Sequence, residues 1–318
     1  MKQIDILKKQ AAEKLNITIQ QVEKLAYIFQ RDQGMEEEES IRKVMGKPIE
    51  IITLKEAAES QVESVKMPIG MEQLDTAMEG GIALGSSIVL AAPSGEGKTA
   101  FMVSLSYHFL KQGCPCLWFS FEENVRDIWE RFKLTGIEET VPAFVPLDLE
   151  DNKLNFIENV ILKFKRKNKM FVVFIDQLSF LAPKITDKSD IDHIQGNYAM
   201  YLGQISQQIK NIAMEQQIII VVAHQLGRTG DVAYSDMIKH APDKVIYLKR
   251  EPDTSPQATE EFTDKTFVIF KKNRPYGSRP KLVMTVKDGL FVKYGDGNLL
   301  NYAKELMHSK KTNTFNFN

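Results

Sequence analysis

The chain has 318 residues, of which 43% are hydrophobic and 26% are charged, and its formal net charge is −1. This composition is typical of a globular protein with room for one large α/β domain and a smaller element. A net charge near zero excludes binding of nucleic acid by bulk positive charge alone, so any such contact has to be local.

Neither the N-terminus nor the cysteines indicate export. The first residues, MKQIDILKKQAAEKL, lack the apolar core of a signal peptide, and the chain has no apolar stretch long enough to span a membrane. Cys114 and Cys116 are too few for a zinc site and are interpreted as reduced, buried residues. We therefore expect a cytoplasmic protein without a membrane segment, and a bacterial, phage or mobile-element source suits the short chain.

The N-terminal part of the sequence predicts helices. Apolar residues recur with a helical period through residues 1–50, which we interpret as a small helical segment that contains the acidic run Glu36 to Glu39. Residues 51–66 predict a linker helix, which either packs on its own domain or docks on a neighbouring subunit.

Residues 67–296 predict an α/β domain, because short β-branched runs alternate with helical ones. This pattern is typical of a mostly parallel central sheet with helices on both faces, followed by a C-terminal β meander. Strands are expected at 86–91, 116–121, 170–175, 217–223, 244–249, 266–272, 281–286 and 290–294. Helices are expected at 98–111, 124–134, 152–166 and 196–215, and residues 297–318 are expected to be a disordered polar tail.

The segment APSGEGKT follows a predicted strand and precedes a predicted helix, the context of a P-loop. Glycines let backbone N–H groups converge on phosphate, and the helix points its positive end at the anion. Ala92 stands where the first glycine of the motif is usual, which is tolerable if that position does not need a positive φ. The expected ATP-binding residues are Ser94, Gly95, Glu96, Gly97, Lys98, Thr99 and Ala100.

Acidic and polar side chains follow three predicted strands at the same edge of the sheet. Asp176 ends the run FVVFID and, with the Thr99 hydroxyl, is expected to hold Mg²⁺. The adjacent Glu122 and Glu123 are expected to point to opposite faces of their strand, so that one faces the nucleotide, and Glu122 is favoured as the catalytic base. The alternative is that both acids belong to the solvated first turn of the next helix.

His224 and Gln225 follow the run IIIVVA at the same edge. The Gln225 amide can both donate and accept hydrogen bonds, so it is a candidate sensor of the γ-phosphate. The alternative is a polar residue that simply leaves a buried strand.

Taken together, these motifs resemble the RecA-like motor domain of the DnaB-type replicative helicases. The similar segments run in order through residues 50–294 and are MPIGMEQLDTAMEGGIALGS, APSGEGKT, WFSFEEN, VVFIDQLSFL, VVAHQLGR and VIFKKNRPYG. The resemblance implies a RecA-like P-loop NTPase that binds ATP and Mg²⁺. The family's large N-terminal helical domain has no counterpart in the first 50 residues.

The resemblance also implies an assembly. In this family a Lys-x-Arg motif reaches the nucleotide of the neighbouring subunit, and Lys272 with Arg274 matches that motif, with Lys271 as an alternative lysine. A residue that acts in trans needs a homo-oligomer, most simply a hexameric ring. A primase or a loader is a further implied partner.

Two loops after the strands that end at Asp176 and Gln225 would face the channel of such a ring. They carry Lys184, Lys188, Arg228 and Lys239 as candidate DNA contacts, together with several aspartates. Surface solvation is the alternative. The sequence thus favours an ATP-dependent ring helicase or translocase on single-stranded or forked DNA, with 5′-to-3′ direction implied by the resemblance. The alternative is a regulatory or recombination ATPase of the KaiC or RadA type.

Overall fold

The computed structural model of the chain describes residues 3–45, 53–55, 65–137, 142–145, 154–181, 191–226, 235–255 and 261–295. The chain divides into two compact units. The first comprises residues 1–64 and 153–169, and the second comprises residues 65–152 and 170–318. The expected C-terminal tail and most of the expected linker helix lie outside the described residues.

The first unit contains short helices, as the period of its apolar residues predicts. They are α1 (Gln3–Leu15), α2 (Ile19–Gln33), α3 (Glu37–Met45) and α8 (Leu154–Lys165). Thr18 and Gln21 form a capping box at the start of α2, and Gly34 ends this helix with a left-handed φ of 62°. A small apolar core joins α1 to α3 and consists of Leu7, Ala11, Val22, Ala26 and Ile41. The acidic run lies at the N-terminus of α3, where negative charge complements the helix dipole.

The second unit is built on a nine-stranded sheet with the strand order β11-β10-β9-β8-β3-β7-β6-β4-β5. The six strands from β8 to β5 are parallel to one another, and β9, β10 and β11 continue the sheet antiparallel. The strands are β3 (Ser87–Ala92), β4 (Cys116–Ser120), β5 (Ala143–Val145), β6 (Val172–Asp176), β7 (Ile219–Gln225), β8 (Lys244–Pro252), β9 (Phe262–Asn273), β10 (Lys281–Lys287) and β11 (Leu290–Lys293). The predicted mostly parallel sheet with a C-terminal meander is therefore confirmed.

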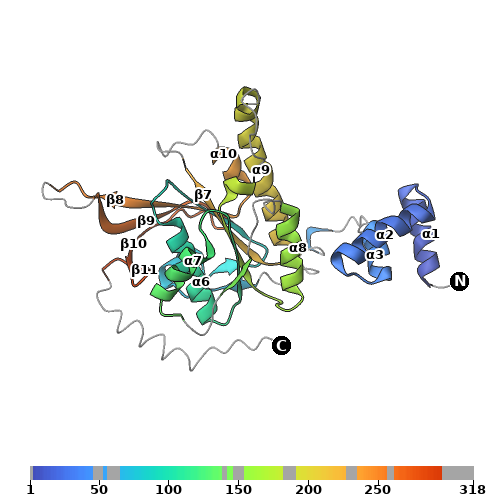
Figure 1. Cartoon of the computed structure of the whole chain (residues 1–318), viewed down its shortest axis with the longest axis horizontal. Helices are drawn as coiled ribbons and strands as arrows, with labels where there is room; N and C mark the ends of the chain where they lie inside the picture. Colours follow the sequence, from blue (N-terminus) through green and yellow to red (C-terminus); the bar gives the residue numbers. More distant parts are fainter. Residues whose placement is uncertain are drawn as a thin grey trace. The chain divides into compact units, whose positions relative to one another are not determined.

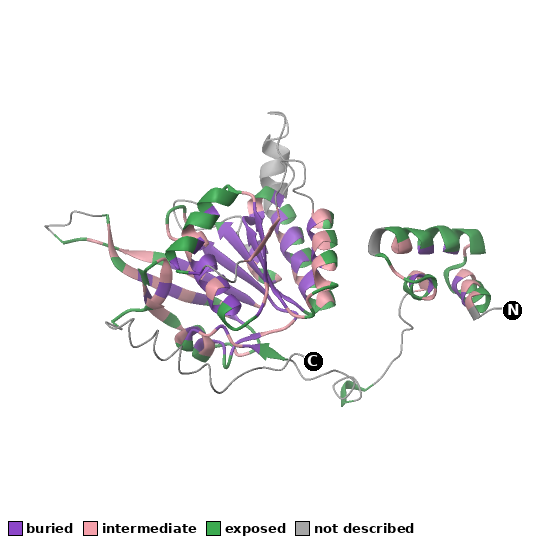
Figure 2. Ribbon diagram, turned by 60° about the horizontal axis from the view of Figure 1, so that its bottom comes forward, coloured by how far each residue is buried: buried purple, intermediate pink, exposed green. Residues whose placement is uncertain are grey.

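Helices cover the sheet on both sides, α6 and α7 on one side and α9 with α10 on the other (Figure 1). The helices are α5 (Glu72–Ala77), α6 (Lys98–Lys111), α7 (Val125–Leu134), the 3₁₀ turn η1 (Leu178–Leu181), α9 (Ile191–Gln216) and α10 (Ser235–His240). A two-stranded sheet of β1 (Lys66–Met67) and β2 (Ile82–Ala83) precedes β3. Figure 2 shows the central strands as almost entirely buried, as expected for a parallel sheet covered on both faces.

Several predicted boundaries are wrong. The predicted strand 116–121 ends at Ser120, because the chain bends at Phe121, and the meander strand predicted at 266–272 extends over 262–273. Six short elements were not predicted, since two to six residues carry too little periodicity; they are β1, α5, β2, β5, η1 and α10.

The register of the sheet separates its two edges. Lys244 in β8 pairs with Ile88 near the start of β3 and with Asn273 at the end of β9. The end of β9 therefore lies at the amino edge of the parallel strands, whereas the P-loop follows Ala92 at their carboxyl edge. The four residue steps from Ile88 to Ala92 span about 13 Å, which is the minimum distance between these two places.

Candidate active site

The P-loop connects β3 to α6, as the sequence predicts. Gly95 and Gly97 have φ of 83° and 89°, a left-handed conformation that favours glycine, and Gly97 is the N-cap of α6. Ala92 is the last residue of β3 and has no positive φ, so the alanine at the first motif position is accommodated without strain. Glu96, in the same loop, accepts a hydrogen bond from the backbone N–H of Arg250 in β8, which ties the loop to the neighbouring strand.

Lys98 is buried at the first position of α6. Its Nζ donates hydrogen bonds to the carbonyl oxygens of Ala92 at 3.2 Å and Pro93 at 3.0 Å. Burial lowers the pKa of Lys98, while the carboxylates of Glu122, Asp176 and Glu96 act in the opposite direction. Phosphate oxygens carry more negative charge than these two carbonyls and can replace them as acceptors for the ammonium group. Lys98 Nζ therefore lies next to the place where a phosphate would bind.

Thr99 and Asp176 meet, although 77 positions separate them in the chain. The Thr99 hydroxyl donates to Asp176 Oδ2 at 2.8 Å, and the other carboxylate oxygen, Oδ1, is buried without a partner among the described residues. A hydroxyl and an under-coordinated carboxylate are oxygen ligands of the kind that Mg²⁺ prefers. These two residues therefore fit the predicted metal site.

Burial is the main cause of an unusual pKa at Asp176. It raises the pKa of this carboxyl from 3.8 to about 6, with smaller upward contributions from Glu122 and Glu123, whereas the Thr99 hydrogen bond and Lys98 oppose the rise. Between about pH 4 and pH 6 the folded protein thus retains a proton that the unfolded chain has released. The free energy of unfolding is expected to fall as the pH rises through this range.

An Asp176→Asn variant should not show this fall in stability. Because two pKa units correspond to about 3 kcal/mol, the nucleotide-free variant should be more stable than the unsubstituted protein at pH 7.5 by up to that amount. The difference should shrink to about 0.5 kcal/mol near pH 4, because the unfolded chain, with a pKa of 3.8, releases the Asp176 proton mainly above this pH. Urea unfolding at both pH values checks this expectation, and a difference in stability that does not change with pH would contradict it.

Glu122 and Glu123 lie beyond β4, so the prediction that they alternate along a strand is wrong. A turn closes after Ser120, whose Oγ donates to the carbonyl oxygen of Glu123 at 2.7 Å and accepts from the Glu123 N–H at 3.3 Å. Glu122 is exposed and makes no side-chain hydrogen bond or ion pair within the described residues, although its charge acts on Lys98 and Asp176. Asn124 caps α7, so both acids precede this helix.

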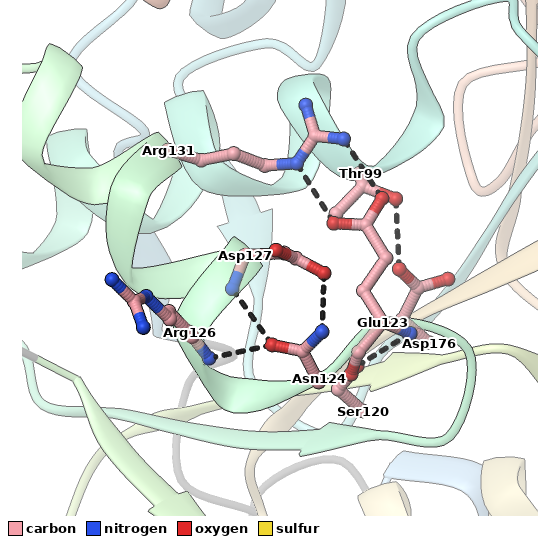
Figure 3. A network of polar contacts seen from close by, with 8 residues as sticks. All are labelled: Thr99, Ser120, Glu123, Asn124, Arg126, Asp127, Arg131 and Asp176. Atoms are coloured by element: carbon pink, nitrogen blue, oxygen red, sulfur yellow. Dashed lines mark hydrogen bonds and ion pairs between the residues drawn. The ribbon is translucent and has the colours of Figure 1, made fainter.

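The Glu123 carboxylate is instead held by Arg131 of α7 (Figure 3). Arg131 donates to both carboxylate oxygens, from Nε and from an Nη, each at 2.8 Å. Arg131 is not among the residues predicted from the sequence. A basic residue two turns into the helix that follows an acidic pair is a weak signal for such a partner, but it does not tell which of the two acids is bound.

His224 and Gln225 end β7 beside Asp176 and Gln177. Gln225 is exposed at the carboxyl edge, and its Oε1 accepts from Gln177 Nε2 at 3.4 Å, a long hydrogen bond that leaves the amide available to a ligand. His224 is buried, its Nδ1 has no partner among the described residues, and burial together with the charge of Lys98 lowers its pKa to about 4. The imidazole is therefore neutral at pH 7.

Lys272 and Arg274 lie at the opposite edge of the sheet from the P-loop. Lys272 Nζ donates to the carbonyl oxygens of Lys239 at 2.9 Å and His240 at 2.7 Å, which places its ammonium at the C-terminal end of α10. The backbone of Arg274 is anchored, because its N–H donates to Asp243 and its carbonyl accepts from Lys244. The Arg274 side chain is exposed.

Of the candidate DNA contacts, Lys184, Lys188 and Arg228 lie outside the described residues. Lys239 lies in α10, with its Nζ 5.8 Å from the centroid of the Tyr247 ring, a cation–π contact.

The fold and the site together define a P-loop ATPase domain. In agreement with this, residues 67–219, just under half of the chain, match the family model of the KaiC ATPases. No helix within the described part of the chain combines the length and apolar character needed to cross a membrane.

Relatives of two kinds are similar to the chain. The DNA repair protein RadA of Rickettsia bellii is 24% identical over 191 residues, which cover 58% of this chain and 38% of RadA. The replicative DNA helicase DnaB of Mycoplasma genitalium is 27% identical over 235 residues, which cover 60% of this chain and 48% of DnaB. The chain thus spans less than half the length of each of these relatives.

Solved structures support the fold. The structure of a DnaB-like replicative helicase and its interactions with primase matches with a TM-score of 0.62 and 20% identity, over 90% of this chain and 76% of the other. The RecA-like fold and the resemblance to DnaB-type ATPase domains are confirmed by these comparisons.

Proposed function

We propose that this chain is the subunit of an ATP-driven motor that moves along single-stranded DNA, unwinds forked DNA and works as a ring, most simply a hexamer. The observation that carries the proposal is the position of Arg274. Its exposed side chain lies at the amino edge of the sheet, at least about 13 Å along the strands from the P-loop of its own chain. An arginine side chain cannot reach across that distance, which supports a role for Arg274 at the site of a neighbouring subunit and not at its own.

Each residue of the proposed site has a separate task. Lys98 leaves the carbonyls of Ala92 and Pro93 to bind the phosphates, and Glu122 accepts a proton from the attacking water. Gln225 hydrogen-bonds the γ-phosphate, and Arg274 of the neighbouring subunit stabilises the charge that develops in the transition state. Thr99 and Asp176 would hold Mg²⁺, which neutralises charge on the β- and γ-phosphate oxygens when it is bound.

The proposal of DNA as the track is supported by the names of the relatives, replicative DNA helicase and DNA repair protein. Lys184, Lys188, Arg228 and Lys239 are the proposed contacts to the phosphate backbone, and 5′-to-3′ movement follows the resemblance to DnaB. A primase is a proposed partner because a similar structure is described with one. This function would take place in the cytoplasm.

The rate of ATP hydrolysis with and without single-stranded DNA tests this proposal. We expect DNA to raise kcat by about tenfold or more, since the track couples the successive sites of the ring, and we expect the rise to weaken with salt. The native mass of the assembly should correspond to a closed ring of subunits. The strands of a forked duplex should be separated in an ATP-dependent manner. A chain that neither binds single-stranded DNA nor is stimulated by it would contradict the helicase function.

A second candidate is a RadA-like ATPase that remodels DNA or protein partners without unwinding. It is favoured by the match to RadA, which is about as strong as the match to DnaB. DNA-stimulated hydrolysis without strand separation on the fork would favour this candidate.

A further inference from the structure

Two adjacent glutamates, Glu122 and Glu123, lie at the nucleotide edge of the sheet, and their side chains have different partners. Both carboxylates lie close enough to Asp176 to raise its pKa. Glu123 makes a bidentate ion pair with Arg131, whereas the Glu122 side chain makes no hydrogen bond or ion pair within the described residues. In Figure 3 the Arg131 guanidinium lies near Thr99 and Asp176, so the ion pair borders the site.

The backbone that carries the two glutamates is fixed without Arg131. Phe121 N–H donates to the carbonyl oxygen of Asp176, and Ser120 closes the turn on Glu123. The Asn124 side chain accepts from the N–H groups of Arg126 and Asp127 at 2.9 and 3.0 Å. Loss of Arg131 would therefore release the Glu123 side chain and leave the path of the chain at Glu122 unchanged.

We propose that Arg131 is a positioning residue that keeps the Glu123 carboxylate out of the nucleotide site, so that Glu122 acts on the attacking water. This inference rests on the proposed ATP hydrolysis at this site. Arg131 donates with the planar fork geometry that arginine provides and lysine does not. In Figure 3 the Glu123 carboxylate is turned to Arg131, beside the Thr99–Asp176 hydrogen bond. A released Glu123 would bring a second negative charge to the water and to Asp176.

The test is a set of variants assayed for kcat and KM without DNA. Arg131→Gln should lower kcat about tenfold and change KM for ATP less than about twofold, because the P-loop contacts are intact. Arg131→Lys keeps the positive charge but lacks the planar fork, so its kcat should lie between that of Arg131→Gln and that of the unsubstituted protein. Glu123→Gln should keep kcat within about threefold, and adding it to Arg131→Gln should raise kcat at least about threefold above the Arg131→Gln value, because the competing charge is gone.

Arg126→Gln is the matched control. Arg126 is an exposed arginine of the same helix, so this variant should keep kcat within about twofold. Arg131 and Glu123 have side chains that are 41% and 22% exposed, and such a pair contributes little to stability, so melting temperatures should change only slightly.

Three outcomes would overturn the inference. The first is an Arg131→Gln variant with unchanged kcat, and the second is a double variant no faster than Arg131→Gln, the result of a purely structural role. The third is a Glu123→Gln variant as inactive as Glu122→Gln, in which case Glu123 itself acts on water. DNA stimulation is measured separately, so failure of the motor function and failure of this inference can be told apart.

Discussion

Replacing Lys98 by alanine should reduce ATP hydrolysis by roughly 10²–10³-fold or more, with or without DNA. The reason is that the first turn of α6 contains no other lysine or arginine to bind the phosphates. The fold should survive. The buried ammonium has a lowered pKa, which means that the protein holds its charge at a cost, and alanine removes this cost in a good helix former. Phosphate release measures the activity, and the melting temperature measures the fold.

Lys111→Ala provides the control for this experiment. Lys111 is the last residue of α6 and is exposed, so the same substitution should leave kcat within about twofold. A Lys98→Ala protein that retains a tenth or more of the rate would contradict the assignment of the P-loop. Since every active form of the proposed enzyme needs Lys98, this variant tests ATP hydrolysis and not the helicase function.

Mixing Arg274→Ala with Glu122→Gln subunits should restore activity that neither variant has alone. By itself, Arg274→Ala should lose about 10³-fold or more in kcat, as expected for an arginine that stabilises transition-state charge. In the mixture, an Arg274→Ala subunit supplies an intact P-loop and Glu122, and a Glu122→Gln neighbour supplies Arg274. With equal amounts and random order, about a quarter of the interfaces are complete, so up to about a quarter of the original rate should return.

A second mixture separates the trans mechanism from other causes of recovery. Lys98→Ala and Glu122→Gln both damage the P-loop half of the site, so mixing them completes no interface and should restore no activity. Recovery in the first mixture and none in the second is the expected pair of results. If the first mixture also stays inactive although mixed assemblies form, Arg274 does not act in trans.

The P-loop, Asp176 and Gln225 were recognisable in the sequence because each follows a run of β-branched or apolar residues. Parallel strands bring their carboxyl ends to one edge, so residues that follow such runs converge whatever their distance along the chain. The Thr99–Asp176 hydrogen bond is the result of this rule. The predicted helix 98–111 also agrees with α6, since the glycine before it and the apolar residues within it are local signals.

The roles of the two glutamates could not be read in the same way. Alternation along a strand holds only while the strand continues, and the Ser120 side chain closes a turn two residues before Glu122. The difference between Glu122 and Glu123 then depends on a salt bridge from the following helix, which aligns only after α7 has folded back to this edge. No pattern of spacing reports that alignment.

The contacts of Lys272, at the other edge of the sheet, could not be predicted from the sequence either. In the sequence it forms part of a Lys-x-Arg motif, but the structure directs its ammonium to two carbonyls at the end of α10, an element too short to predict. The half-buried position, with the charge of Arg274 nearby, lowers the pKa of Lys272 to about 8. Arg274, one position beyond β9, is the member of the motif with an exposed side chain.

The sequence by itself determined the class of domain, the phosphate-binding loop and the acid that accompanies it, because these depend on local periodicity and on strand ends. The tertiary structure decided which glutamate is restrained, which cation of the Lys-x-Arg motif is exposed, and that Arg274 lies at the far edge from its own P-loop. These features depend on the register of β8 against β3 and β9 and on contacts between segments that are remote in the chain. Such contacts follow from packing in three dimensions, which a one-dimensional pattern does not contain.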